Sequence, residues 1–296
     1  MSARLLDGRE LASRLRRELR HRLEALVGHA LEGEEAAAAE PLPALAIVTD
    51  GASPAATLYA ASLERASRAI GVPVHLSTEI ASAESDIDRL NADAGTAGIV
   101  IAQPFADPVL RRRLVERIDP AKDVDGATPT NAGWLARGEP AFVPATALAV
   151  VAILEAYKVP VAGRRAVVVG RSAVVGRPVA SLLLARDATV VVCHRATRNL
   201  ARETRRADIL VAAAGVPGLI RPEMVNRSAV VVDCGISAVE GGGIAGDVDF
   251  AGVAPVVRAI TPVPGGIGPV TPMMVLRQVV EAAEWTASGA TAGSPH

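Results

Sequence analysis

The sequence predicts an α/β protein whose strands pair in parallel and which contains a dinucleotide-binding unit. Short apolar runs rich in β-branched residues alternate with longer segments of helical periodicity. Within residues 166–195, a buried strand, a glycine turn, a helix and a second buried strand follow one another. At 296 residues, the chain is long enough for two domains of ordinary size or for one large domain.

Composition narrows the range of partners. The formal net charge of −1 argues against a nucleic acid or a membrane surface as the main partner. No apolar run approaches the roughly 18 residues of a membrane span, and the charged, amphipathic N-terminus is unlike a secretory signal. Cys193 and Cys234 both lie in apolar, strand-like runs, which is typical of buried free thiols. We therefore expect a cytoplasmic protein.

The first half of the chain predicts alternating helices and strands. Leucines at helical spacing predict an amphipathic helix over Arg9–Val27, and the Ala/Glu-rich stretch His29–Glu40 is interpreted as a helix end or a mobile insert. Ser53 and Pro54 suit the N-cap and first position of a helix that ends before Gly71. The other expected elements are strands at Ala44–Val48, Val72–Leu76 and Gly98–Ala102, and helices at Glu84–Asp93 and Asp107–Ile118.

The second half begins with the apolar helix Thr146–Lys158, which we expect to connect two domains. The Pro- and Gly-rich stretch Pro262–Pro269 is predicted to be neither helix nor strand, and three glycines between prolines favour a ligand-binding loop. A final helix is expected over Pro272–Trp285, followed by a disordered tail. The expected strands are Ala166–Val169, Thr189–Cys193, Ile209–Ala213, Val230–Asp233 and about Ala259–Thr261.

The turn after Val169 carries an imperfect dinucleotide-binding fingerprint. The usual loop reads G-x-G-x-x-G, whereas here Ser172 replaces the second glycine and Gly176 comes one residue late. The helix N-terminus that follows such a turn can bind an anion. The loose match also allows an ordinary turn between a strand and a helix.

The end of the second strand indicates which dinucleotide is bound. An NAD site usually has Asp or Glu there to hold the ribose 2′-hydroxyl. This chain instead has His194 and Arg195, with Arg198 close behind and Arg171 in the preceding turn. Because cations suit a 2′-phosphate, we interpret the site as an NADP site.

Two further segments could take part in chemistry. Asp123 and Asp125 could hold a metal, but no His or further carboxylate stands at ligand spacing, so a polar substrate contact or a helix-capping turn is favoured. Tyr59, one of two tyrosines, lies on the helix after residues 50–54 and is either a core or a functional residue.

Together, several ordered motifs resemble the bifunctional methylenetetrahydrofolate dehydrogenase/methenyltetrahydrofolate cyclohydrolase family of one-carbon metabolism, and the resemblance covers nearly the whole chain. The motifs that carry it are Lys122-Asp123-Val124-Asp125-Gly126, Gly170-Arg171-Ser172, Val175-Gly176-Arg177-Pro178, Cys193-His194, Asp233-Cys234-Gly235-Ile236, Gly246-Asp247-Val248 and Ile260-Thr261-Pro262-Val263-Pro264-Gly265-Gly266.

The resemblance implies a fold, a cofactor and a substrate. It implies a folate-binding domain over residues 1–145 and 272–296, a Rossmann-type NADP-binding domain over 146–271, and an active site in the cleft between them. It also implies tetrahydrofolate derivatives as substrates and a homodimer; the lack of further ligands near Asp123 and Asp125 separately leads us to expect no metal. Carried onto this sequence, the cofactor contacts are Gly170, Arg171, Ser172, Arg195 and Ile236. The folate contacts are Tyr59, Asp125, Pro264, Gly265 and Gly266.

The expected catalytic residues are Tyr59, Gln103 and Asp125, but the chain departs from the family pattern around them. The family has lysine one helical turn after the tyrosine, where this chain has Leu63. The family glutamine has moved one residue along, from Ala102 to Gln103, which turns a strand side chain to the other face. A Pro-Cys-Thr-Pro run appears here with Ala145 in place of cysteine.

The missing lysine should affect hydrolysis more than oxidation. In the oxidation the cofactor supplies the bond chemistry and the protein aligns the reactants. Hydrolysis of the methenyl product needs a positioned acid and base, commonly worth roughly 10²–10⁴-fold. Leu63 cannot act as either, and arginine stays charged at any working pH. Lys122 is the one remaining lysine nearby, although the family places it beside the pterin acid.

Four functions therefore stay open, of which the weakest is a fully altered substrate specificity within the same cleft. The first is an NADP-dependent dehydrogenase with weak or absent cyclohydrolase, which we favour. The second is the full bifunctional enzyme, with Gln103 and a repositioned group or water replacing the lysine. The third is a non-catalytic paralogue that binds NADP or folate and acts through a partner. The retained Asp125 and Pro-Gly loop weigh against the third.

Overall fold

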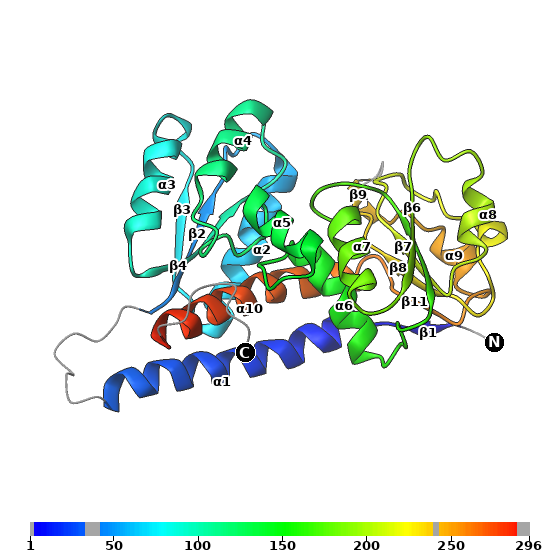
Figure 1. The fold of residues 1–296 in the computed structure, drawn as a ribbon, viewed down its shortest axis with the longest axis horizontal. Helices are drawn as coiled ribbons and strands as arrows, with labels where there is room; N and C mark the ends of the chain where they lie inside the picture. The colour runs from blue at the N-terminus through cyan, green and yellow to red at the C-terminus, as the bar shows by residue number, and fades with distance from the viewer. Residues whose placement is uncertain (1–2, 33–41, 239–242, 289–296) are drawn as a thin grey trace. The chain divides into compact units, whose positions relative to one another are not determined.

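The computed structural model describes residues 3–32, 42–238 and 243–288 (Figure 1). Its backbone forms two compact units. The first, called here the six-stranded unit, comprises Met1–Ser13 and Pro144–Thr271, and the second, the three-stranded unit, comprises Arg14–Val143 and Pro272–His296. Two of the three boundaries between the units fall inside long helices, α1 (Gly8–Glu32) and α10 (Ile267–Ala287), and the third directly precedes α6 (Ala145–Ala156). None of the helices in these three stretches is long and apolar enough to cross a membrane.

The six-stranded unit is built on a parallel sheet whose central strands are buried on both faces. Such strands consist of nearly continuous Val, Ile, Leu and Ala because helices and loops cover both sides of the sheet. The sheet order is β1 (Arg4–Leu5), β11 (Ala259–Ile260), β8 (Val230–Asp233), β7 (Ile209–Ala212), β5 (Arg165–Val169) and β6 (Thr189–Cys193).

The helices of this unit connect its parallel strands. The β5–α7–β6 segment is a βαβ unit in which α7 packs against both strands and against α6. A short antiparallel hairpin of β9 (Ser237–Ala238) and β10 (Ile244–Ala245) follows β8. The helices are α6 (Ala145–Ala156), α7 (Gly176–Leu184), α8 (Leu200–Thr204), α9 (Phe250–Val253) and the 3₁₀ turn η2 (Pro222–Met224).

The three-stranded unit has a smaller parallel sheet in the order β3 (Val74–Ser77), β2 (Ala44–Val48), β4 (Thr96–Ile101). Apolar residues of β2 and β4 share one core with α3 and α4, which pack on each other (Figure 1). In addition to α1 and α10, the helical elements are α2 (Pro54–Ile70), η1 (Ile80–Ser82), α3 (Ala83–Ala92), α4 (Pro108–Arg117) and α5 (Pro129–Arg137).

The predicted α/β class with parallel strands is confirmed, and so are the helix from Pro54 to Ile70 and the bounds of β6 and β8. Gly71 ends α2 with φ = 95°, a conformation that glycine adopts freely. Cys193 is buried and Cys234 half-buried, and neither forms a disulfide. Most of His29–Glu40 and the tail beyond residue 288 lie outside the described residues.

Three expectations need correction. The Pro-Gly loop ends earlier than expected, because α10 begins at Ile267; Pro269 lies in its first turn, where a missing N–H has no helical acceptor. Helix α5 was not expected at all. Strand β1 (Arg4–Leu5), which pairs with β11, was not expected either.

Candidate active site

A pocket of about 460 Å³ opens at the carboxyl ends of β5, β6 and β7. This edge of an open parallel sheet is where α/β proteins bind ligands, because the connections diverge there. Four of the five expected cofactor contacts line the pocket: Gly170, Arg171, Ser172 and Arg195. The fifth, Ile236, is not among its lining residues and is 62% exposed.

The turn between β5 and α7 is shaped by two glycines. Gly170 has φ = 133°, and a Cβ on it would lie 2.0 Å from the carbonyl oxygen of Ala213. A Cβ on Gly176 would lie 2.2 Å from the carbonyl oxygen of Gly170. Ser172, which replaces a fingerprint glycine, accepts hydrogen bonds through Oγ from the N–H groups of Val175 and Gly176. The turn is therefore as tight as a dinucleotide loop requires, although its sequence differs.

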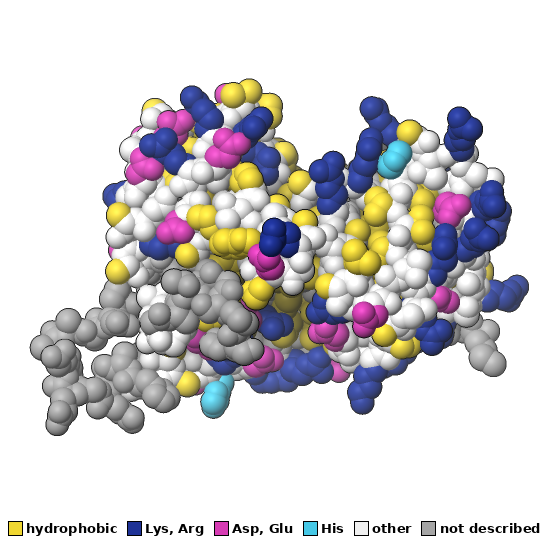
Figure 2. Space-filling view, in the orientation of Figure 1, with side chains coloured by type: hydrophobic (Ala, Val, Ile, Leu, Met, Phe, Trp, Pro, Cys, Tyr) yellow, Lys and Arg dark blue, Asp and Glu magenta, His cyan; other side chains and the backbone are white. Residues whose placement is uncertain are grey.

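The pocket is also suited to bind an anion. No Asp or Glu is among its lining residues, whereas Arg171 and Arg195 are, and both side chains are exposed. Within the described parts of the chain, neither arginine forms an ion pair. In the view of Figure 2, dark-blue Lys and Arg side chains are frequent over the unit that carries β6 and α8. Shape and charge thus fit a dinucleotide with several phosphates.

The pocket wall after β7 is held by Asp247, a fully buried residue that we did not single out from the sequence. Its carboxylate accepts hydrogen bonds from three consecutive N–H groups, those of Ala214, Gly215 and Val216. Ala214 and Val216 line the pocket. Asp247 therefore fixes the backbone of residues 214–216, two of which line the pocket, although Asp247 itself does not line it.

A second buried carboxylate, Asp233, holds Asp247 in turn. Asp233 Oδ1 accepts a 3.0 Å hydrogen bond from the N–H of Asp247, and Oδ2 accepts one of 2.9 Å from Val248. Burial raises the pKa of Asp233 from its ordinary value of 3.8 to about 6, even though its hydrogen bonds favour the charged form. Both carboxylates lie in motifs that carry the family resemblance, which is the signal that would have identified them.

The Pro-Gly loop packs its glycines against the start of α1. Gly265 has φ = 117°, and its carbonyl accepts a 2.8 Å hydrogen bond from the N–H of Gly8. A Cβ on Gly265 would lie 2.8 Å from Cζ of Arg9. Gly266 donates through its N–H to the carbonyl of Pro262, whereas Pro264 is exposed. The loop is thus rigid within the six-stranded unit, and its contact with folate stays a prediction.

In the three-stranded unit, Tyr59 and Asp125 lie close enough to interact. The pKa of the Tyr59 hydroxyl is well above its ordinary range, first because of burial and second because of the charge on Asp125. Leu63, one turn after Tyr59 on α2, is fully buried. Ala102 is also fully buried, whereas Gln103, in the loop after β4, is half-buried. Gln103 is therefore more accessible to solvent than Ala102, the position that holds glutamine in the family pattern.

Lys122 and Asp123, which precede Val124 and Asp125, both form hydrogen bonds with backbone groups. Lys122 Nζ donates to the carbonyls of Leu90, Asn91 and Asp93 at 3.0, 2.8 and 2.7 Å, at the end of α3. The carboxylate of Asp123 accepts from the N–H groups of Ala127 and Thr128 and from Asn131 Nδ2 at the start of α5. Asp123 thus stabilises the turn before α5, whose N-cap is Thr128. Within the described residues, no three His, Cys, Asp or Glu are grouped to hold a metal ion.

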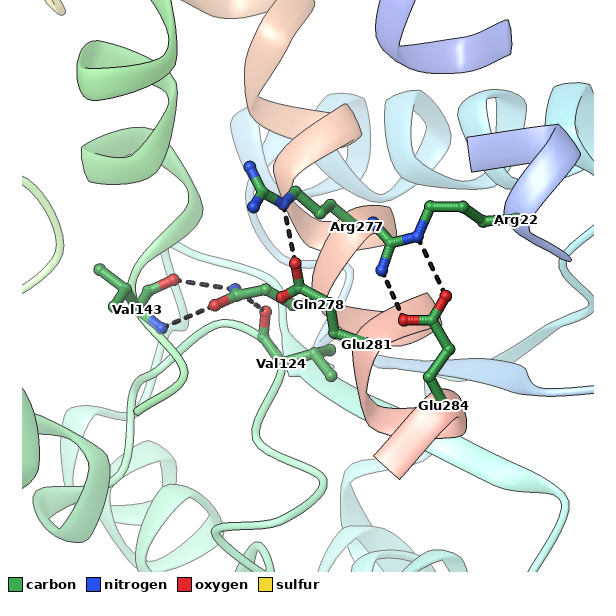
Figure 3. Close-up of polar contacts among 7 residues, drawn as sticks. All are labelled: Arg22, Val124, Val143, Arg277, Gln278, Glu281 and Glu284. Atoms are coloured by element: carbon green, nitrogen blue, oxygen red, sulfur yellow. Dashed lines mark hydrogen bonds and ion pairs between the residues drawn. The ribbon is translucent and has the colours of Figure 1, made fainter. Parts of the chain in front are cut away.

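The segment that carries Asp125 is held by Gln278 of α10, a residue that sequence reasoning missed (Figure 3). Gln278 Nε2 donates to the carbonyls of Val124 and Val143 at 2.7 and 2.9 Å, and Oε1 accepts from the N–H of Val143 at 2.8 Å. Gln278 is buried among apolar residues, and a lone glutamine in a helix of apolar periodicity was the available signal. The final helix therefore completes the three-stranded unit.

Comparison with known proteins matches two family models to the chain. Residues 6–125 match the tetrahydrofolate dehydrogenase/cyclohydrolase catalytic domain, and residues 144–287 match the NAD(P)-binding domain of the same family. Curated relatives named bifunctional protein FolD match nearly the whole chain. The one from Chloroflexus aggregans is 43% identical over 95% of this chain and 98% of its own length, and that from Parafrankia sp. is 44% identical over 95% and 99%.

Solved structures agree with this assignment. The Campylobacter jejuni bifunctional FolD methylenetetrahydrofolate dehydrogenase/cyclohydrolase is 37% identical, with a TM-score of 0.88 over 96% of this chain and 99% of its own. The Trypanosoma brucei methylenetetrahydrofolate dehydrogenase-cyclohydrolase, complexed with NADP cofactor and inhibitor, is 32% identical, with a TM-score of 0.89 over 97% and 99%. Taken with the pocket and the Tyr59–Asp125 pair, these matches show that the chain belongs to the tetrahydrofolate dehydrogenase/cyclohydrolase family.

Proposed function

We propose that this chain catalyses the NADP-dependent oxidation of 5,10-methylenetetrahydrofolate to 5,10-methenyltetrahydrofolate. The observation that carries the proposal is the pocket in which Gly170, Arg171, Ser172 and Arg195 lie around one cavity without an acidic residue. Without an acid after β6, a bare ribose 2′-hydroxyl lacks its usual acceptor, whereas two arginines suit a 2′-phosphate. The NADP complex of the T. brucei relative supports the same cofactor.

When bound, NADP accepts the hydride that leaves the one-carbon unit, so the protein mainly binds and aligns the two reactants. On the folate side, the family resemblance assigns packing on the substrate to Tyr59 and a hydrogen bond to the pterin to Asp125. The raised pKa of Tyr59 keeps its hydroxyl protonated at neutral pH, beside the charge on Asp125. Tyr59 therefore offers a neutral ring and a hydroxyl donor near the charged carboxylate of Asp125.

Hydrolysis of the methenyl product is the second candidate activity, and the comparisons favour it, because relatives that match the whole chain are named as bifunctional. Two features of this chain oppose it. Leu63 takes the place of the lysine, and Lys122 already donates to three carbonyls. On these grounds, we propose that the cyclohydrolase step is slow or lost.

One assay tests both activities. Purified protein receives methylenetetrahydrofolate and NADP, and the NADPH and methenyl products are followed separately. We expect NADPH formation with accumulation of the methenyl product. Absence of NADPH at every enzyme concentration would reject the dehydrogenase and favour the non-catalytic paralogue. Loss of the methenyl product well above the uncatalysed rate would establish the full bifunctional enzyme.

Assembly and location complete the proposal. Family resemblance supports a homodimer, and composition supports a cytoplasmic enzyme without nucleic acid or membrane partners. Sedimentation velocity of the purified chain tests the homodimer directly, since a single species at the mass of one chain would reject it.

A further inference from the structure

Tyr157 is the second tyrosine of the chain, and none of the motifs that point to the cofactor or to folate contains it. It directly follows α6, and its side chain is half-buried. The hydroxyl accepts a 2.8 Å hydrogen bond from the N–H of Asp7 and donates one of 3.0 Å to the carbonyl of the same residue. One side chain thus binds both backbone groups of a residue 150 positions earlier in the sequence.

Asp7 occupies the junction between β1 and α1. Before it, the N–H of Leu6 donates to the carbonyl of Ile260 at 2.9 Å, which continues the pairing of β1 with β11. After it, the N–H of Arg9 in the first turn of α1 donates to the carboxylate of Asp7 at 2.7 Å. The Asp7 side chain therefore caps the helix, while Tyr157 holds the Asp7 backbone.

The residue after Asp7 is the one against which the Pro-Gly loop packs. The N–H of Gly8 donates to the carbonyl of Gly265, and a Cβ on Gly8 would lie 1.7 Å from the carbonyl oxygen of Gly266. At such a close approach of two backbones, a shift of Gly8 has to move the loop as well. Tyr157 therefore fixes the backbone next to the residue that determines where the loop lies.

We propose that Tyr157 is a positioning residue for the oxidation, whose hydroxyl acts through Asp7 and Gly8 to hold the Pro-Gly loop where it contacts folate. The inference rests on the proposed dehydrogenase and on the folate contact that the family resemblance assigns to this loop. Because hydride transfer depends on the alignment of two reactants, a small displacement of the loop slows the reaction.

Tyr157→Phe tests the role of the hydroxyl, because it removes that group and keeps the ring. Steady-state kinetics at saturating NADP should show a roughly 10- to 100-fold fall in kcat/KM for methylenetetrahydrofolate. The dissociation constant of NADPH, measured by fluorescence titration, should stay at the wild-type value. A wild-type chain that forms no NADPH would reject the proposed function and this inference together, whereas a wild-type kcat/KM in the variant would reject the inference alone.

Gly8→Ala displaces the loop directly, since its Cβ would meet the carbonyl of Gly266. It should lower the same kcat/KM at least as much as Tyr157→Phe does. If both changes act through one contact, Tyr157→Phe should add little in the double variant, because the loop has already moved. Two effects that multiply in the double variant would show that Tyr157 acts elsewhere, and would overturn the inference.

Arg4 provides the matched control, because it contacts Tyr157 without reaching the hydroxyl. Its guanidinium carbon lies 5.0 Å from the centre of the Tyr157 ring, and Nη1 donates to the Tyr157 carbonyl at 3.5 Å. Arg4→Met removes both contacts and should leave kcat/KM at the wild-type value. A purely structural Tyr157 would lower only the thermal midpoint, or would weaken NADPH binding in parallel with kcat/KM, and either result for Tyr157→Phe overturns the inference.

Discussion

Lys122 Nζ lies 2.7 Å from the carbonyl oxygen of Asp93 and also donates to the carbonyls of Leu90 and Asn91. The ammonium therefore caps the C-terminal end of α3, where backbone carbonyls lack helical partners. The only other lysine of the chain, Lys158, belongs to the six-stranded unit. The lysine next to the predicted pterin acid is thus part of the scaffold.

Replacing this lysine should cost stability and leave hydrolysis as it is. Lys122→Met keeps most of the aliphatic stem but leaves three carbonyls without their donor, which should lower the free energy of unfolding by about 1–3 kcal/mol. Urea denaturation measures the loss. A parallel fall in methenyl hydrolysis, at temperatures where the variant stays folded, would instead give Lys122 a chemical role.

Restoring a lysine at position 63 should create the missing activity. Leu63→Lys places an amine one helical turn after Tyr59, and methenyl hydrolysis should rise by roughly 10²–10⁴-fold while NADPH formation persists. Because Leu63 is fully buried, we also expect a loss of about 1–3 kcal/mol in stability. Leu63→Met has a similar volume and no amine, so it should gain nothing. Equal hydrolysis by the Lys and Met variants would contradict this account.

Gln278 offers a test of how α10 supports Asp125. Gln278→Leu removes one acceptor and two donor contacts to the backbone of Val124 and Val143, so stability should fall by about 2–4 kcal/mol. The KM for methylenetetrahydrofolate should rise, while the affinity for NADP should change little.

The adjacent residue provides a matched control (Figure 3). Arg277 is exposed and bonds Glu281 one turn away at 2.8 Å, and such surface pairs contribute little. Arg277→Ala should therefore leave both the unfolding midpoint and the folate KM near their wild-type values. A folate KM that is unchanged in Gln278→Leu would show that Asp125 does not depend on this helix.

Removing the buried carboxylate behind the cofactor wall should affect NADP and spare folate. Asp247→Ala leaves the N–H groups of 214–216 without an acceptor, and we expect NADPH affinity to fall by roughly 10- to 100-fold. Fluorescence titration with NADPH measures the change. Asp249→Ala, an exposed cap of the short helix α9, is the control and should bind NADPH normally. Similar titration curves for the two variants would contradict the role of Asp247.

The pKa of Asp233 predicts a specific pH dependence of stability. Burial raises this pKa from 3.8 to about 6, so the folded state holds the proton more tightly than the unfolded state. Protonated Asp233 therefore adds at most about 3 kcal/mol to the free energy of unfolding. This contribution is fully present below pH 3.8 and is lost as the pH rises through 6. Asp233→Asn lacks this contribution.

The measurement is the difference in unfolding free energy between the wild type and Asp233→Asn at a series of pH values. Wild type should lose stability relative to the variant between pH 4 and 7. Exposed Asp249→Asn serves as the comparison for general effects of removing a charge. A flat difference curve for Asp233→Asn would show that the buried carboxyl does not titrate in this range.

Elements whose signal is local could be predicted from the sequence. Buried parallel strands such as Thr189–Cys193 consist of continuous β-branched residues, and α2 has a proline at its start and a glycine at its end. Helix α5 was missed because it is only 9 residues long, contains Gly133, and its buried residue is the polar Asn131. Strand β1 is too short for any pattern, and it exists because β11 offers an edge to pair with.

The residues of the site also fall into those that could be predicted from the sequence and those that could not. The turn 170–172 and Arg195 could be placed because strand, turn and helix follow one another in sequence. The positioning roles of Asp247 and Gln278 could not, because their partners are backbone groups at least 31 residues away, which composition does not reveal. The complete burial of Leu63 could not be predicted either. Helical spacing indicates which face of α2 carries the side chain, but only the packing of the folded unit determines how far it is buried.

The pairing of β1 with β11 has a consequence for how the protein is made. The first strand to leave the ribosome has to wait for residues 259–260 before its sheet partner exists, and the bonds from Gln278 to residues 124 and 143 form later still. Each unit therefore depends on residues that are synthesised late. The six-stranded sheet can be completed once residue 260 has been synthesised, and the three-stranded unit once Gln278 has been synthesised, so each unit joins the first half of the chain to its last 40 residues.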